Sequence, residues 1–366
     1  MVEWLAGNRI RGTSTERTTG AGFNPVNAVS GGWKELARVT SNDTDVTSIP
    51  DKRYYMILSD HGWNTANAGI GMQINGDTTG GHYPRRYSQN GGSEATPTSE
   101  TNIFTDTMGG GTQTGKRWFM VQHIANKSNK EKLIQYDMVF NRSGLGEGNA
   151  PDRIEGVAKW TDTSESIDRL DLRNFNSGTI TSDSQVVVLG WDPDDTHTDN
   201  FWEQLASTDW SSGSGIDTGT FTAKKYLWVQ GWYKTGSMSG SYSALQVGNG
   251  TIDTGSNYAE RYSMGGSGYV ESANASNLFA PVGQGNDPSN VHTFFNLFII
   301  NNASSEKLII SRAGGFDTAG VTQHPNRSEA VSKWDNTSAQ INRLKVSSQA
   351  GSGNYTAGNI TVWGSD

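Results

Sequence analysis

The chain contains no cysteine among its 366 residues, so disulfide bonds, thiolate metal sites and cysteine nucleophiles are excluded. It also lacks any run of basic residues longer than three, and its formal net charge is −8. Binding to a phosphate backbone needs clustered lysine and arginine side chains. The composition therefore argues against a nucleic-acid partner.

Long apolar segments are missing as well. No stretch approaches the ~18–20 apolar residues of a membrane span, and the start, MVEWLAGNRIRG, has neither the basic nor the apolar region of a signal peptide. We expect no membrane insertion, and synthesis in the cytoplasm without a signal peptide. The isolated histidines predict no metal site and no cofactor; they are His61, His82, His123, His197, His292 and His324.

Glycine is abundant, with 45 residues, and tryptophan, tyrosine and phenylalanine occur 12 times each. Short aromatic and β-branched stretches alternate with Gly, Asn, Asp, Ser and Thr, which is typical of all-β proteins. A chain of this length suits two domains of roughly 150–200 residues.

The sequence contains one module twice, in tandem. The matching segments are WKELA at 33–37 with WEQLA at 202–206, KRYY at 52–55 with KKYL at 224–227, HYPRRYS at 82–88 with NYAERYS at 257–263, EKLI at 131–134 with EKLI at 306–309, and RIEGVAKWTDTSESIDRL at 153–170 with RSEAVSKWDNTSAQINRL at 327–344. The spacing between copies changes only from 169 to 175 residues, so they differ by short loop insertions. A repeat without a catalytic cluster indicates a binding or assembly protein.

Strand patterns recur at the same places in both copies, about eight per copy with polar turns between them. This predicts two tandem jelly-roll-like antiparallel β-sandwich domains with an extended N-terminal arm. We place the arm at 1–32, the first module at 33–192, a linker at 193–201 and the second module at 202–366. A short helix or turn is expected at 154–160 and at 328–334.

The arm has few apolar anchors for its length, namely Trp4, Leu5, Ile10 and Phe23. Such a segment cannot bury enough apolar surface to offset its own ordering entropy. It either packs back along its own domain or lies on a neighbouring subunit. We expect it to mediate assembly.

Several aromatic and basic positions recur in both copies. They are Trp33 and Trp202, Tyr54 and Tyr226, Arg86 and Arg261, and Trp160 and Trp334. The paired Trp160 and Trp334 stand before polar loops and could stack on a sugar, but a core role that pins the loop is favoured. Arg86 and Arg261 could recognise a ligand, but stacking on tyrosine within a strand is favoured.

Acidic residues offer weaker candidates. Asp192, Asp194, Asp195 and Asp199 could hold calcium but lack the EF-hand spacing, so a solvated acidic linker is favoured. The pairs Glu131/Glu306 and Glu155/Glu329 could form a carboxylate pair, although cross-strand ion pairs are the simpler interpretation. Residues 110–117 only partly match a phosphate-binding loop, because Arg117 replaces its Ser or Thr.

The repeated motifs also resemble a module that recurs in structural proteins of tailed phages and related viruses, notably marine ones. The resemblance is carried by Trp33 and Trp202, by Lys52–Tyr54 and Lys224–Tyr226, by Lys159–Leu170 and Lys333–Leu344, and by Tyr355–Gly364. The first copy departs from the closing motif at Thr181–Ser184. The resemblance covers nearly the whole chain, implies a virion surface or tail component, and assigns no binding residue.

Two classes of function follow. The first is a non-enzymatic virion structural protein, a head decoration or a tail or fibre component, which associates with itself and with other virion proteins. The second is a carbohydrate-binding adhesion protein with host surface glycans as partners. A glycan hydrolase is disfavoured, because no repeated acidic pair stands in a convincing setting.

Overall fold

The structure is a computed structural model that describes residues 32–65, 69–103, 115–141, 143–176, 178–193, 195, 199–237, 242–266, 268–283, 292–315, 325–349 and 354–366, and the backbone of residues 3–5 and 8–11. Trp4 and Leu5 lie on β1 (Glu3–Leu5) and Ile10 on β2 (Asn8–Arg11), which pair as an antiparallel hairpin. The rest of 1–31, including Phe23, lies outside the described residues.

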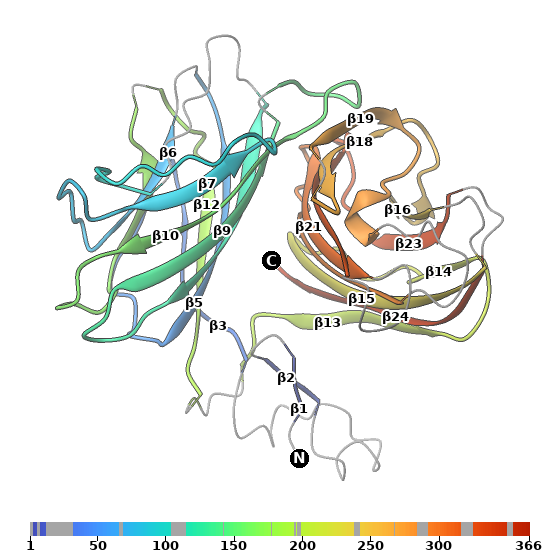
Figure 1. Ribbon diagram of the computed structural model, residues 1–366, viewed down its shortest axis with the longest axis horizontal. Coiled ribbons are helices and arrows are strands. Elements are labelled where there is room, and N and C mark those ends of the chain that lie inside the picture. Colours follow the sequence, from blue (N-terminus) through green and yellow to red (C-terminus); the bar gives the residue numbers. More distant parts are fainter. Residues whose placement is uncertain are drawn as a thin grey trace.

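The first module is a sandwich of a seven-stranded and a three-stranded sheet, seen at the left of Figure 1. The large sheet has the order β3 (Lys34–Thr40), β12 (Gln185–Trp191), β5 (Tyr54–Gly62), β8 (Arg117–Ala125), β9 (Lys132–Phe140), β10 (Asp152–Trp160), β7 (Arg85–Gln89). The small sheet has the order β4 (Thr44–Val46), β11 (Leu170–Asn174), β6 (Ile70–Ile74).

The second module repeats this plan with an eight-stranded and a four-stranded sheet. The large sheet has the order β13 (Glu203–Trp210), β24 (Asn354–Ser365), β15 (Tyr226–Ser237), β20 (His292–Ile300), β21 (Lys307–Gly315), β22 (Asn326–Trp334), β18 (Tyr258–Met264), β19 (Val270–Ala275). The small sheet has the order β14 (Gly215–Asp217), β23 (Arg343–Ser348), β16 (Ser243–Asn249), β17 (Thr251–Ile252).

Both modules are antiparallel sandwiches whose chain passes repeatedly between the two sheets, which confirms the predicted all-β, jelly-roll-like class. Successive side chains of a strand point to opposite faces of its sheet, so one strand contributes to two apolar clusters. On β15, Leu227 and Val229 enter the sandwich core, whereas Tyr226 and Trp228 lie on the opposite face. In the described part of the chain, helical structure is limited to the 3-10 turn η2 (Ala280–Val282), and no helix is long and apolar enough to cross a membrane.

The predicted helix or turn at 154–160 and 328–334 is wrong, because both segments are strands, β10 and β22. Their alanine, glutamate and lysine residues favour helix locally. Each strand is nevertheless paired on both sides, β10 by β9 and β7, and β22 by β21 and β18. Tertiary pairing thus overrides local propensity.

The repeated tryptophans at 160 and 334 are core residues that fasten a loop in each copy. Trp160 is 1% exposed and donates its indole N–H to Asp77 at 2.7 Å, and Trp334 is 2% exposed and donates to Asp253 at 2.8 Å. A lysine ammonium lies over each ring, Lys132 at 4.9 Å and Lys307 at 5.7 Å. The two copies share the same internal support.

The two modules are joined through the outer faces of their large sheets. Trp33 and Trp202 are both buried in this junction. Its apolar side chains come from both modules and from Phe201 at the end of the linker. They are Trp33, Met56, Leu58, Phe119, Val121, Val139, Val187 and Leu189 from the first module, and Trp202, Tyr226, Trp228, Phe298, Ile300, Leu308, Ile310, Val331 and Trp363 from the second. A continuous apolar cluster of this kind holds the modules as one body.

A buried charged group reinforces the junction. The carboxylate of Asp60, fully buried, accepts hydrogen bonds from Arg117 at 2.8 and 2.9 Å and from Asn302 of the second module at 2.9 Å. Lys225, also of the second module, lies 3.4 Å away. Burial alone would raise the pKa of Asp60, but these cations outweigh it and hold that pKa below its usual value.

The modules meet about a local twofold axis. Met56 and Trp228 are equivalent residues of the two modules, and their neighbours on the next strand are His123 and Phe298. His123 and Phe298 are therefore equivalent to each other. Their ring centroids lie 6.3 Å apart. Equivalent Asp137 and Arg312 likewise form an ion pair. A residue that contacts its own equivalent lies close to a twofold axis.

The two sides of this axis differ. On one side the ring of Phe119 packs near that of Tyr226, with centroids 6.3 Å apart. The equivalent residues on the other side are Phe294 and Tyr54, and they are 53% and 37% exposed. The junction is closed on one side and open on the other.

Candidate functional site

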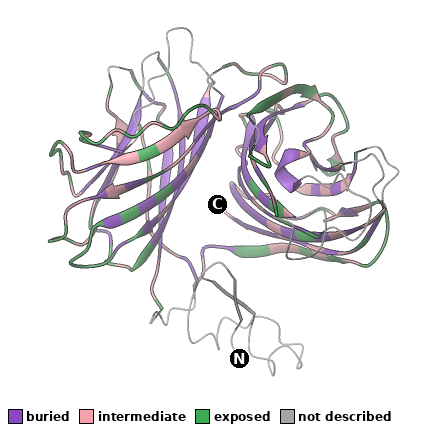
Figure 2. Cartoon of the chain, in the orientation of Figure 1, coloured by how far each residue is buried: buried purple, intermediate pink, exposed green. Residues whose placement is uncertain are grey.

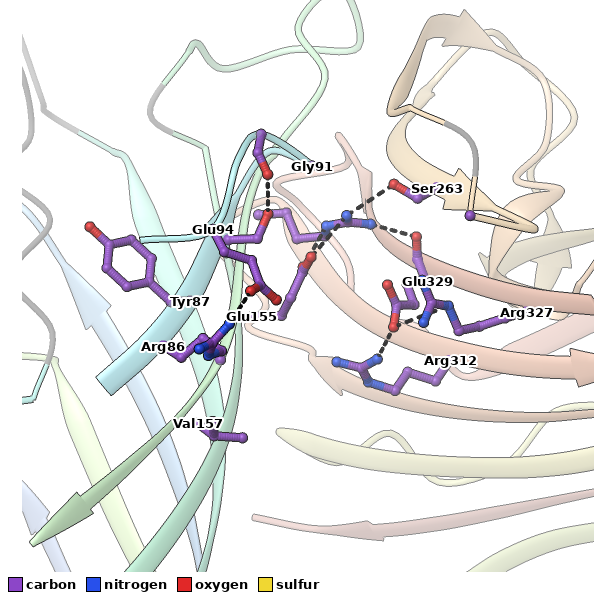
Figure 3. A pocket seen from close by; sticks show the side chains of 15 residues that line it. Arg86, Tyr87, Gly91, Glu94, Glu155, Val157, Ser263, Arg312, Arg327 and Glu329 are labelled. Atoms are coloured by element: carbon purple, nitrogen blue, oxygen red, sulfur yellow. Dashed lines mark hydrogen bonds and ion pairs between the residues drawn. The ribbon is translucent and has the colours of Figure 1, made fainter. Parts of the chain in front are cut away.

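A cleft of roughly 410 Å³ lies between the modules, and Figure 3 shows it from close by. One wall comes from β7 and β10 of the first module, and the other from β18, β21 and β22 of the second. The inter-module cleft is lined by Arg86, Tyr87, Ser88, Gly91, Gly92, Glu94, Arg153, Glu155, Gly156, Val157, Ser263, Gly266, Arg312, Arg327 and Glu329. Four arginines and three glutamates make it a polar site with both donors and acceptors.

Arg153 connects the two walls. Its guanidinium group donates to Glu155 at 3.0 Å, to the backbone carbonyl of Glu329 at 2.7 Å and to the hydroxyl of Ser263 at 3.1 Å. The side chain is only 4% exposed. Arg153 is therefore a structural bridge at the base of the cleft.

The equivalent glutamates Glu155 and Glu329 line the same cleft, although the sequence favours cross-strand ion pairs for them. Glu329 forms such a pair with Arg312 on the next strand, whereas Glu155 pairs with Arg153 on its own strand, β10. Burial raises the pKa of Glu155 to about 7, and the facing Glu329 adds to the rise against the opposing charge of Arg153. Their proximity follows from module packing and has no signature in the sequence.

The two arginines of the repeated Arg-Tyr-Ser motif have different environments. Arg261 is buried, donates to the carbonyl of Pro151 at 2.8 Å and lies 5.3 Å over the ring of Tyr269. Arg86 is 60% exposed in the cleft and pairs with the equally exposed Glu94 at 2.6 Å. The sequence predicts that both arginines stack on a tyrosine. Arg261 does so, on Tyr269, whereas Arg86 lines the cleft.

Tyr54 and Tyr226 also differ between the copies. Tyr226 is 1% exposed and donates its hydroxyl to Gln185 at 2.8 Å within the junction. Tyr54 stacks on Trp191 with ring centroids 5.4 Å apart and borders a second, apolar groove of roughly 440 Å³. Trp33, His123, Leu133 and Gln135 line the same groove.

An aromatic pair marks the outer face of the second large sheet. Trp232 and Phe294 are register partners on β15 and β20 and are 42% and 53% exposed. In Figure 2, exposed and buried segments alternate along the strands of both large sheets. Apolar side chains therefore remain on the outer sheet faces beyond the junction.

The acidic linker binds lysines of its own chain. Asp195 pairs with Lys52, and Asp199 lies 3.2 Å from Lys34. Within the described residues, no group of three or more histidines, aspartates or glutamates is placed to hold a metal ion. Asp194 and residues 110–114 of the loop that partly matches a phosphate-binding motif lie outside the described residues.

No protein-family model and no curated protein matches the chain. Among solved structures, the chain is similar to domains LG4-5 of the mouse laminin alpha1 chain, with 11% identity over 87% of this chain and 82% of that one, at a TM-score of 0.20. The botulinum neurotoxin serotype C1 binding domain is 9% identical over 78% and 80% of the two chains, at a TM-score of 0.11. Similarities this low carry no argument about function.

Proposed function

We propose that the chain is a non-enzymatic structural protein of a virion, either a head decoration or a tail or fibre component. It associates with copies of itself and with other virion proteins through its N-terminal arm and its sandwich faces. The observation that supports this most is the junction, which joins two copies of one module into a single body. A building block that must present its faces at a constant angle needs such a junction.

The exposed apolar groups fit the same proposal. Trp232 and Phe294 on the second module, and Tyr54 and Leu133 on the first, leave apolar surface on both large sheets. Large exposed aromatic side chains are enriched at protein contacts. Neighbouring virion proteins are the partners that would cover them.

The first test is the mass of the purified chain by light scattering, with negative-stain imaging of the same sample. We expect a trimer, a ring or a filament. A strict monomer at high concentration would contradict self-association and favour the carbohydrate-binding function described below.

The arm supplies the most direct variant. Deletion of residues 1–32 should leave both modules folded, since their cores lie within 46–188 and 216–362, and should abolish self-association. Circular dichroism reports the fold and light scattering the mass. Unchanged assembly of the shortened chain would remove the arm from the proposal.

A carbohydrate-binding adhesion function is the second candidate, and the inter-module cleft favours it. The cleft has the volume of a small-ligand site, and its polar side chains converge from two modules. A glycan array with the full chain tests it. Binding to no glycan would leave the structural role as the remaining proposal.

A further inference from the structure

The duplication shows which arginines the fold itself needs. At the Arg-Tyr-Ser position, Arg261 is 6% exposed and held in the junction, whereas its equivalent Arg86 is 60% exposed. At the start of the shared segment 153–170, Arg153 is 4% exposed and bridges the modules, whereas its equivalent Arg327 is 64% exposed. At each of these two positions, one arginine is buried and joins the two modules, and its equivalent in the other copy is exposed.

The two exposed arginines, Arg86 and Arg327, line the same cleft, one from each wall, as Figure 3 shows. Arg86 comes from β7 of the first module, and Arg327 from β22 of the second. Their present contacts are weak. Arg86 meets Glu94 in an ion pair of two well-exposed side chains, and Arg327 lies 3.6 Å from a Glu329 oxygen that Arg312 already occupies. Exposed ion pairs of this kind exchange readily for a ligand anion.

We propose that the inter-module cleft binds an acidic sugar, whose carboxylate or sulfate ester is held by the guanidinium groups of Arg86 and Arg327. The proposal rests on the carbohydrate-binding function named above and supplies its site and ligand class. Planar guanidinium groups bind oxyanions with two parallel hydrogen bonds, which gives both affinity and orientation.

The rest of the lining indicates a sugar rather than a bare anion. Glu94, Glu155 and Glu329 line the cleft beside the arginines, each in an ion pair with an arginine, and a carboxylate has acceptor sites for further donors such as sugar hydroxyl groups. Tyr87 adds an aromatic ring on the first module's wall. A ligand that carries one oxyanion and several hydroxyl groups satisfies both sets of partners.

Contacts between the two modules fix the walls that carry Arg86 and Arg327 before any ligand binds. Arg153 and Arg312 each contact both modules, Arg153 through Glu155 and the Glu329 carbonyl, and Arg312 through Asp137 and Glu329. The walls that carry Arg86 and Arg327 are therefore set before binding. Preorganisation of this kind lowers the entropic cost of association.

The test uses the full chain and titration calorimetry with defined probes. The acidic probes are an oligogalacturonate, which carries carboxylates, and a carrageenan oligosaccharide, which carries sulfate esters. A neutral agarose oligosaccharide and inorganic sulfate complete the set. Arg86→Gln and Arg327→Gln are compared with Arg53→Gln, a matched control whose half-exposed side chain lies outside the cleft.

We expect at least one acidic oligosaccharide to bind, and each cleft variant to weaken its Kd about tenfold or more. Arg53→Gln should match the unmodified chain. An equal loss in all three variants would reveal unspecific attraction and overturn the assignment. Neutral-oligosaccharide binding that persists in both cleft variants would keep the carbohydrate function but overturn this site. Binding of no probe, inorganic sulfate included, would overturn both.

Discussion

Glu155 shows how one carboxyl group comes to depend on the packing of two modules. It faces Arg153 on its own strand, Asp137 on β9, and Glu329 and Arg312 on the second module. Desolvation is the largest influence and raises its pKa to about 7. In an unfolded chain the same group would titrate near 4.3. The folded protein therefore retains this proton over a pH range in which the unfolded chain has lost it.

A stability difference follows at this residue. The contribution of protonated Glu155 is fully present below about pH 4.3 and is lost as pH rises through about 7, by an amount of the order of 3–4 kcal/mol. Glu155→Gln, which keeps a neutral side chain, should equal the unmodified chain near pH 4 and exceed it in stability near pH 8. Urea unfolding at several pH values measures this.

Glu131→Gln is the matched control, because it removes a partly exposed carboxylate of the same module. The comparison between variants is needed because His61 acts in the opposite direction. Burial lowers the pKa of His61 to about 3, so its stabilising effect is lost as pH falls from about 6.5 to that value. A constant difference between Glu155→Gln and the unmodified chain across pH 4–8 would contradict the shift.

At the scale of elements, β10 depends on a glycine that close packing requires. A side-chain carbon at Gly156 would lie 2.6 Å from the backbone oxygen of Arg86 and 2.5 Å from the hydroxyl of Tyr136. Gly156 pairs with Tyr136 on β9 and with Tyr87 on β7, so the strand cannot move away from either neighbour without breaking the sheet.

Gly156→Ala should therefore destabilise the protein by about 1–3 kcal/mol through overpacking. Gly314→Ala, in β21 of the second module, is the control, because its nearest neighbour would be 4.0 Å away. Thermal unfolding compares the two variants. Equal stability of both would show that β7 and β9 yield easily at this point.

The sequence pattern predicts the strand-rich character of both modules. It fails where pairing with neighbouring strands determines the conformation of a segment. The all-β class and the two antiparallel sandwich modules follow from short aromatic and β-branched stretches between polar turns, and the structure has both modules. The composition of the segment 154–160 favours helix and the prediction there is wrong, because two neighbouring strands hold the segment extended.

At the scale of the whole molecule, the sequence identified two copies but not how they meet. Identical residue types at equivalent positions have opposite environments, as Tyr54 and Tyr226 or Arg86 and Arg261 show. No local pattern separates an exposed tyrosine from a buried one when both follow a basic residue at the start of a strand. The cleft, and with it the candidate site, arises only from the contact between modules.

The unequal sides of the junction leave one set of equivalent contacts unmade within the chain. On the closed side Asp60 meets Lys225, and the equivalent positions on the open side are Trp232 and Arg53. Phe294 and Tyr54 are the equivalents of Phe119 and Tyr226 and remain exposed. Because the apolar cluster and the buried Asp60 hold the modules as one body, we expect the open side to stay open.

Because the chain has no cysteine, a disulfide test of this fixed angle is simple to build. Tyr54→Cys with Phe294→Cys should form no disulfide within one chain on mild oxidation, so no faster-migrating monomer should appear on a non-reducing gel. Tyr54→Cys with Val270→Cys gives the background, since Val270 lies on β19 at the far edge of the sheet. A cross-link within one chain above that background would contradict the fixed angle, and a cross-link between chains would mark a contact between copies. A fixed angle would make the chain a spacer that sets the direction between whatever binds its two modules.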